Sequence, residues 1–132
     1  MKIAMNTWCF PDDIGLPAIL DAVQEAGFQG VELNMTDDGY LTPYSGPNDY
    51  ANLKQMCNTR NLTLHAMASN IFFITPLTLD GEEGELVMNK AKMYIYAAAS
   101  MGVDTVLLTP GAVNENISYI QAYERAGNNI TE

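Results

Sequence analysis

The feature of the sequence that most constrains its fold is a segment that occurs twice and has a looser third copy. Ala26-Gly-Phe-Gln-Gly-Val-Glu-Leu33 matches Met101-Gly-Val-Asp-Thr-Val-Leu-Leu108 position by position, and Arg60-Asn-Leu-Thr-Leu64 resembles both. Each copy reads as a helix end, a glycine or asparagine suited to left-handed backbone, an apolar residue and a strand. Strands that alternate with helices in this way predict right-handed βαβ units and a parallel sheet.

The pattern predicts four βα units in one domain that spans residues 1–132. The expected strands are 2–8, 28–34, 62–70 and 103–109, and the expected helices are 16–26, 49–60, 86–101 and 117–126. An apolar loop, 71–77, follows the third strand, and an acidic stretch, 80–85, leads into the third helix. The predicted fold class is therefore α/β, with four parallel strands and about four helices.

Composition and charge exclude several classes of protein. At 132 residues and 48% hydrophobic content, the chain can bury one core. A net charge of −10 with only six basic residues argues against nucleic acid as a partner, because binding phosphates needs clustered Lys and Arg. Cys9 and Cys57 form no CxxC pair, and no segment reads as a signal peptide or a membrane span. We expect a cytoplasmic protein that contacts no membrane.

Polar side chains share one face of each expected strand, opposite the apolar residues that helices would cover. The carboxyl ends of parallel strands meet at one edge, where α/β proteins place their sites. The alternation therefore predicts a single cluster at that edge, formed by Asn6, Trp8, Glu32, Asn34, His65 and Thr109.

Each member of this cluster has two interpretations. His65 is either a base or ligand, or a hydrogen-bonded structural residue. Glu32 is either a base or ligand, or an acceptor that fixes a loop. Trp8 is expected to form a wall of the pocket because it ends a strand. The remaining members either contact a ligand or fix loops; they are Asn6, Asn34 and Thr109.

Four segments of the chain together resemble the first half of the xylose-isomerase-like barrel family, the sugar-phosphate isomerases and epimerases related to endonuclease IV. They are the opening strand that ends in Trp8, Ala26–Leu33, the Leu62–Asn70 strand with Pro76-Leu77 in the following loop, and Met101-Gly-Val-Asp-Thr-Val-Leu-Leu-Thr-Pro-Gly111. The tail Ala122-Tyr-Glu-Arg-Ala126 also resembles the helix that follows in that family. The resemblance covers nearly the whole chain, and the order and spacing of the segments are more specific than any one of them.

The resemblance implies a (β/α)8 barrel in which a divalent metal (Mn, Mg, Co or Zn) polarises a sugar and carboxylates move a proton. It implies catalytic roles for Glu32 and His65. It implies sugar contacts for Asn6, Trp8, Asn34, Phe72, Phe73 and Thr109. The family's metal ligands in the epimerase branch lie on strands five to eight, so no metal-binding residue is predicted in this chain and the metal is not expected to bind to it alone. In the endonuclease IV branch two histidines bind zinc; His65 matches the first, but Thr109 stands in place of the second, which disfavours a DNA-repair hydrolase.

A full barrel needs ~250 residues, so we expect this chain to be an incomplete, N-terminal half-barrel. As an enzyme it would be a sugar-phosphate isomerase or epimerase that is inactive alone, with a sugar or sugar phosphate as ligand. The alternative is a non-catalytic binding module that self-assembles, in which a homodimer completes the barrel. A small doubly wound sheet is a third interpretation, but no glycine-rich phosphate loop follows the first strand.

Overall fold

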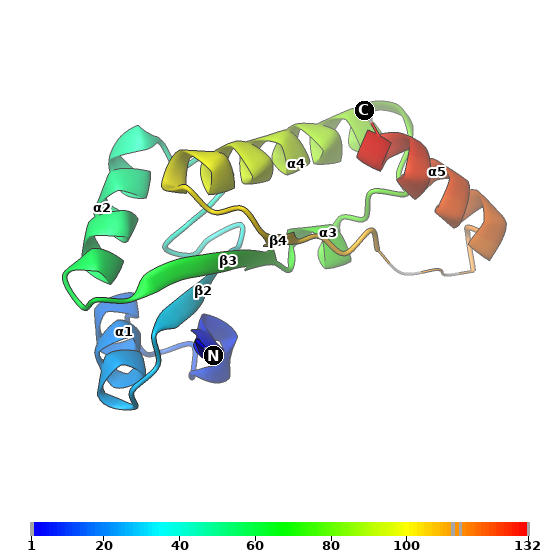
Figure 1. Ribbon diagram of the computed structural model, residues 1–132. Helices are drawn as coiled ribbons and strands as arrows, with labels where there is room; N and C mark the ends of the chain where they lie inside the picture. The colour runs from blue at the N-terminus through cyan, green and yellow to red at the C-terminus, as the bar shows by residue number, and fades with distance from the viewer. Residues whose placement is uncertain (1, 112, 114, 132) are drawn as a thin grey trace.

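A parallel four-stranded sheet in the order β1-β2-β3-β4 organises the computed structural model, which describes residues 2–111, 113 and 115–131 (Figure 1). The predicted α/β class with four parallel strands is confirmed. The strands are β1 (Ala4–Asn6), β2 (Gly30–Met35), β3 (Thr63–Ser69) and β4 (Val106–Leu107). The helices are the 3₁₀ turn η1 (Thr7–Cys9), α1 (Leu16–Glu25), α2 (Pro47–Asn58), α3 (Ile71–Ile74), α4 (Gly81–Met101) and α5 (Tyr119–Thr131).

Several elements differ in their bounds from the sequence-based expectation: Thr7 and Trp8, expected in the first strand, lie in η1, and β4 is shorter than the expected strand 103–109. The apolar loop after β3 contains the short helix α3, which begins where the Ser69 hydroxyl accepts the Ile71 N–H at 3.2 Å and where Ile71 is fully buried. Helix α4 begins at Gly81 rather than 86, so Glu82 and Glu83 lie in its first turn instead of preceding it. Acidic side chains there interact favourably with the positive end of the helix dipole.

The left-handed residues predicted at three helix ends are confirmed. The backbone φ angles are +80° at Gly27, +55° at Asn61 and +74° at Gly102. An L residue with a Cβ is strained in this region, whereas glycine is not and asparagine tolerates it. Each such residue turns the chain from a helix directly into the next strand.

This geometry predicts opposite effects for the same substitution at two glycines. Gly102→Ala forces a Cβ into left-handed backbone and should lower the free energy of unfolding by about 1–2 kcal/mol. Gly127→Ala lies inside α5 with no atom near the added methyl, so it should raise that free energy by about 0.5–1 kcal/mol. Urea denaturation of the two variants measures both, and equal signs would contradict the backbone argument.

The hydrophobic core lies between one face of the sheet and helices α1, α2 and α4. Val31, Leu33 and Met67 project from that face and are fully buried. Tyr94 of α4 is also fully buried, and its hydroxyl donates toward the Met67 carbonyl at 2.7 Å and the Leu107 carbonyl at 3.1 Å. One side chain of α4 thus ties β3 to β4.

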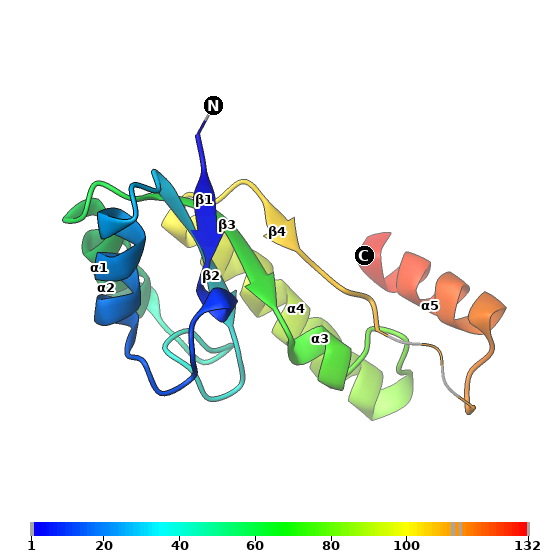
Figure 2. The ribbon, with the colours of Figure 1, turned by 90° about the horizontal axis from the view of Figure 1, so that it is seen from below.

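The opposite face of the sheet carries no helix in the described part of the chain, and Figure 2 looks onto it, with α4 behind the strands. An irregularity in the pairing of β2 with β3 decides which residues meet there. Leu64 pairs with Val31, but Ala66, not His65, pairs with Glu32. His65 is thus an extra residue in β3 with no partner on β2, as in a β-bulge.

Candidate functional site

Three side chains predicted to cluster at the carboxyl ends of the strands are hydrogen-bonded to one another. Asn6 ends β1 and pairs in register with Glu32 of β2, and its Nδ2 donates to Glu32 Oε2 at 2.6 Å. Asn34, two residues further along β2, donates from Nδ2 to Asn6 Oδ1 at 3.0 Å. The alternation of β1 and β2 placed these side chains on one face, and their register brings them into contact.

The surroundings of Asn6 fix which way both amides point. The Trp8 backbone N–H donates to Asn6 Oδ1 at 2.7 Å, so Asn6 must present its oxygen there and its nitrogen to the Glu32 carboxylate. The Asn34 atom that faces Asn6 Oδ1 must then be the nitrogen, because two oxygens without a proton cannot bond. Asn34 Oδ1 is left buried without a hydrogen-bond partner among the described residues.

Two further residues complete the network, and the sequence analysis did not predict either. Asn34 Nδ2 also donates to Thr7 Oγ1 at 2.6 Å, and the Thr7 and Tyr40 hydroxyl oxygens lie 2.7 Å apart. The Tyr40 hydroxyl accepts the Asn34 backbone N–H at 3.0 Å. Burial raises the pKa of Tyr40 above its ordinary value, so the phenol stays protonated at neutral pH.

Tyr40 reaches the network because the loop after β2 turns sharply. The Thr36 N–H donates to the Leu41 carbonyl at 3.0 Å, which closes the loop. A Cβ at Gly39 would overlap the Thr36 hydroxyl, so a larger residue there requires that hydroxyl to move. The pair Gly39-Tyr40 in a turn-rich loop after a strand was the signal in the sequence that could have identified this residue.

A groove of about 710 Å³ lies beside part of this network. Its walls come from η1 and the loops that follow β1, β2 and β3, and Trp8, which is 47% exposed, lines it as expected of a pocket wall. Thr7, Asn34 and Tyr40 of the network also line the groove, whereas Asn6 and Glu32 do not. The groove therefore occupies the end of the sheet where parallel α/β proteins bind ligands.

The structure does not bring His65 into this cluster. His65 is the third residue of β3, and its Cβ lies 3.6 Å from where a Cβ on Gly30, the first residue of β2, would be. It lines a small cavity of about 90 Å³ with Lys2 and Gln29, at the amino ends of the strands. The extra residue in β3 explains this position, and the catalytic role suggested for His65 stays a prediction.

The other predicted contact residues are placed differently from one another. Phe72 is fully buried in the core and packs against Tyr94 with ring centroids 5.7 Å apart, so it does not line the groove. Phe73 is 67% exposed on α3 and does not line it either. Thr109 follows β4 at its carboxyl end, and its buried Oγ1 has no hydrogen-bond partner in the described part of the chain.

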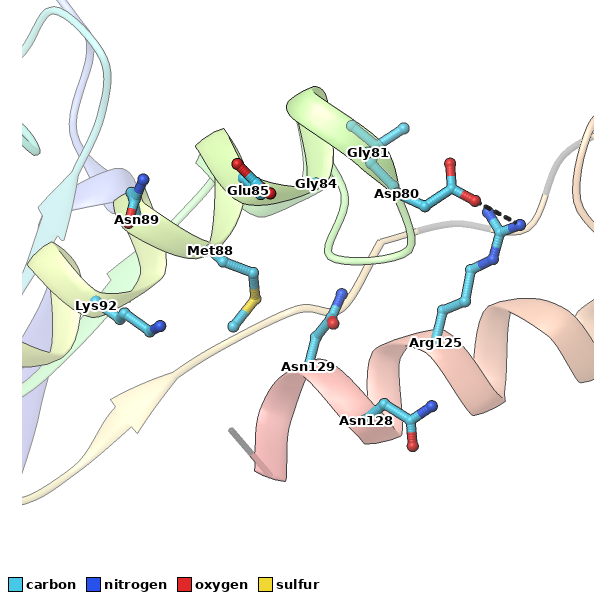
Figure 3. A pocket seen from close by; sticks show the side chains of 11 residues that line it. Asp80, Gly81, Gly84, Glu85, Met88, Asn89, Lys92, Arg125, Asn128 and Asn129 are labelled. Atoms are coloured by element: carbon cyan, nitrogen blue, oxygen red, sulfur yellow. Dashed lines mark ion pairs between the residues drawn. The ribbon is translucent and has the colours of Figure 1, made fainter.

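A second groove of about 620 Å³ separates α4 from α5 (Figure 3). Arg125 of α5 forms an ion pair with Asp80 at 2.8 Å, and Asn129 Nδ2 donates to the Leu77 carbonyl at 2.6 Å. These contacts anchor α5 beside the beginning of α4. The groove is lined by ordinary helix-surface residues, and none of the predicted site residues lies in it.

The described residues do not form a metal site. No group of three His, Cys, Asp or Glu side chains among residues 2–111, 113 and 115–131 lies close enough to hold an ion. The hydrogen-bond partner of the Glu32 carboxylate among these residues is the amide of Asn6. Within the same residues, no helix is both long enough and apolar enough to cross a bilayer.

Comparison with known proteins identifies the fold family of this sheet. The family model described as "Xylose isomerase-like TIM barrel" matches residues 20–132. The chain belongs to this family. The resemblance inferred from the repeated helix–strand joints is thereby confirmed, although no curated protein matches the chain.

Solved structures of xylose isomerase-like barrels and related epimerases share the fold. D-psicose 3-epimerase, crystallised in the presence of D-fructose, superposes with a TM-score of 0.74 at 11% identity, over 98% of this chain and 46% of that one. AP endonuclease family 2 from Brucella melitensis gives 0.69 at 14% identity, over 97% and 47%. The E. coli 3-keto-D-glucoside 4-epimerase gives 0.63 at 13% identity, over 97% and 48%.

The chain thus spans about half the length of the barrels that it matches. Its four parallel strands correspond to half of a xylose isomerase-like barrel, and the open face seen in Figure 2 corresponds to the barrel interior. The network of Asn6, Glu32 and Asn34 therefore lies on the interior-facing side, at the carboxyl-terminal mouth.

Proposed function

We propose that this chain supplies one half of a sugar isomerase or epimerase, and that the groove at the strand carboxyl ends holds the sugar. The observation that carries the proposal is the Glu32 carboxylate, half-buried at the mouth of the sheet and hydrogen-bonded only through Oε2 to Asn6 among the contacts of the described residues. A carboxylate held by one amide can accept a proton from a carbon next to a carbonyl and return it. Trp8 provides the apolar wall against which a sugar ring packs.

The proposal assigns only part of the chemistry to this chain. The sugar extends from the groove, whose walls include Trp8 and Asn34, toward Glu32, which moves a proton and is oriented by Asn6. Proton transfer between two carbons of a ketose or aldose requires a second acid or base on the sugar. The described residues provide no set of metal ligands, and in this proposal both the metal and the second acid or base come from the other half of the barrel.

The experiment that tests this proposal compares binding with turnover in the purified chain. We expect a ketose such as D-fructose to perturb the fluorescence of Trp8, the one tryptophan of the sequence, and Glu32→Gln to abolish turnover only in a completed barrel. The chain alone should show no isomerisation of ketoses or aldoses with Mn²⁺ or Mg²⁺. Turnover by the purified chain would contradict the assignment of half the chemistry to missing strands.

A second candidate is a self-assembled homodimer, and the two sheet edges favour it. In the described part of the chain β1 pairs only with β2, and β4 pairs only with β3. Near these edges Ile3 is 51% exposed and Leu107 is 52% exposed. Unpaired edges with apolar side chains readily pair with another chain.

For the homodimer we expect the chain to elute from a size-exclusion column as a dimer, with the mass measured by light scattering. Leu107→Lys should dissociate it because a charge then lies at the β4 edge. Ile95→Lys, at a position 54% exposed on α4, is the matched control and should leave the dimer intact. A monomer at all concentrations tested would rule this candidate out.

A further inference from the structure

The charge around the groove at the strand carboxyl ends bears on whether the groove binds an uncharged sugar or a phosphorylated one. Three aspartates line the groove, Asp12, Asp37 and Asp38, and no Lys or Arg is among the described residues that line it. The basic side chain that approaches is Lys90, whose Nζ lies 2.7 Å from Asp37 Oδ1 and is thereby neutralised. The carboxylates of Asp12 and Asp38 pair with no basic side chain in the described part of the chain.

We propose that this groove takes an uncharged, hydroxyl-rich ligand and rejects a phosphorylated one. The inference rests on the proposed function, that the groove holds a sugar, and it decides which class of sugar. A phosphate dianion in the groove would face two uncompensated carboxylates inside a protein whose net charge is already −10. Repulsion of this kind acts over the Debye length, ~8 Å at physiological salt, which is comparable to the size of a monosaccharide.

The floor of the groove matches a neutral ligand in its hydrogen bonding. Asn34 is 3% exposed and lines the groove. The bonds from its Nδ2 to Asn6 and Thr7 fix the orientation of the amide, and in that orientation Oδ1 has no donor among the described residues. A buried acceptor without a partner destabilises the protein, and a hydroxyl donor from a ligand would relieve that cost. Carboxylates at the rim are also acceptors, so sugar hydroxyls can donate to them whereas phosphate oxygens cannot.

Trp8 reports on this groove directly because the sequence has one tryptophan. The experiment titrates the chain with D-fructose and with D-fructose 6-phosphate at low ionic strength while Trp8 emission is recorded. We expect D-fructose to bind at least about tenfold more tightly than its phosphate ester, with the difference shrinking as salt screens the carboxylates. Equal or tighter binding of the ester would overturn the charge inference and leave the proposed sugar site standing. If neither sugar perturbs Trp8, the proposed function fails and this inference fails with it.

Charge-changing variants separate the effect of the groove from that of net charge. Asp38→Asn should bring the affinity for the phosphate ester closer to that for D-fructose and should increase quenching of Trp8 by iodide. Asp104→Asn is the matched control, since it changes the net charge equally but lies in the exposed connection before β4, at the amino ends of the strands. If both variants change iodide quenching to the same extent, the repulsion comes from the whole protein and the inference is overturned.

Discussion

Tyr94→Ala is expected to lower the free energy of unfolding by about 3–5 kcal/mol, the range for removing a buried aromatic ring. Tyr94 is fully buried, and its ring packs against Phe72 with ring centroids 5.7 Å apart. Its hydroxyl also bonds the carbonyls of Met67 and Leu107, so the substitution removes both the ring and the tie between β3 and β4. Because small domains are stable by only ~5–15 kcal/mol, this loss is a large fraction of the total.

Tyr94→Phe isolates the contribution of the hydroxyl and keeps the prediction testable if the alanine variant does not fold. It preserves the ring but removes the donor from the buried Met67 carbonyl and the part-buried Leu107 carbonyl, so we expect a loss of about 1–3 kcal/mol. Burial raises the pKa of Tyr94, and the negative charge of Glu32 raises it further, so the hydroxyl remains a donor at neutral pH. Hydrogen exchange should show the largest loss of protection in β4.

Tyr96 provides the matched control, two residues further along the same helix. It is 55% exposed, and its ring meets the ring of Tyr50 edge to face with centroids 6.4 Å apart. Tyr96→Ala should therefore cost less than about 1.5 kcal/mol, the upper value for an aromatic pair. Urea denaturation of Tyr94→Ala, Tyr94→Phe and Tyr96→Ala measures the three effects. Similar losses at the two tyrosines would show that Tyr94 does not hold β3 and β4 together.

The local chemistry of the chain was sufficient to predict the sheet and part of the site. Gly27, Asn61 and Gly102 marked the helix ends because few residues adopt left-handed backbone without strain. Between these points the period-two alternation set the faces of β1 and β2. That is why Asn6, Glu32 and Asn34 were expected on one face and do contact one another.

The position of His65 could not be predicted, because the sequence does not reveal the extra residue in β3. From sequence, the register of a strand is inferred from the alternation of apolar and polar residues along it. In β3 that contrast disappears at Ala66 and Ala68, which are small enough to fit on either face. A shift of one residue therefore leaves no trace in the pattern, yet it puts Ala66 beside Glu32 where His65 was expected.

The contributions of Tyr40 and Phe72 depend on tertiary contacts that periodicity does not report. Tyr40 lies outside any regular element, and its place beside Thr7 follows from the closure of one loop. Phe72 and Phe73 are adjacent in an apolar segment, but α3 turns Phe72 into the core and Phe73 outward. Because a helix separates adjacent side chains by about 100°, the unexpected α3 decided which phenylalanine was buried.

Asn6→Asp is expected to destabilise the protein at neutral pH by about 2–3 kcal/mol, and to do so less as the pH falls. The new side chain has nearly the same shape, and its oxygen can still accept the N–H groups of Trp8 and Asn34. It replaces the donor that lies 2.6 Å from Glu32 Oε2 with a second carboxylate. The loss of a hydrogen bond to a charged group sets the size of the effect, and repulsion between like charges adds to it.

The sign of the pH dependence follows from proton binding by the new carboxylate pair. As the pH falls, the adjacent carboxylates of the folded variant take up a shared proton at a pH at which the separated groups of the unfolded chain are still ionised. The folded state therefore binds more protons, so the stability of the variant relative to the original protein rises as the pH decreases. Asn52→Asp, at an exposed position in the middle of α2 and three residues after Asp49, adds the same charge where solvent screens it and should show a much weaker trend. Urea midpoints across a pH series compare the two variants, and a difference between them that stays constant with pH would show that Asn6 does not orient Glu32.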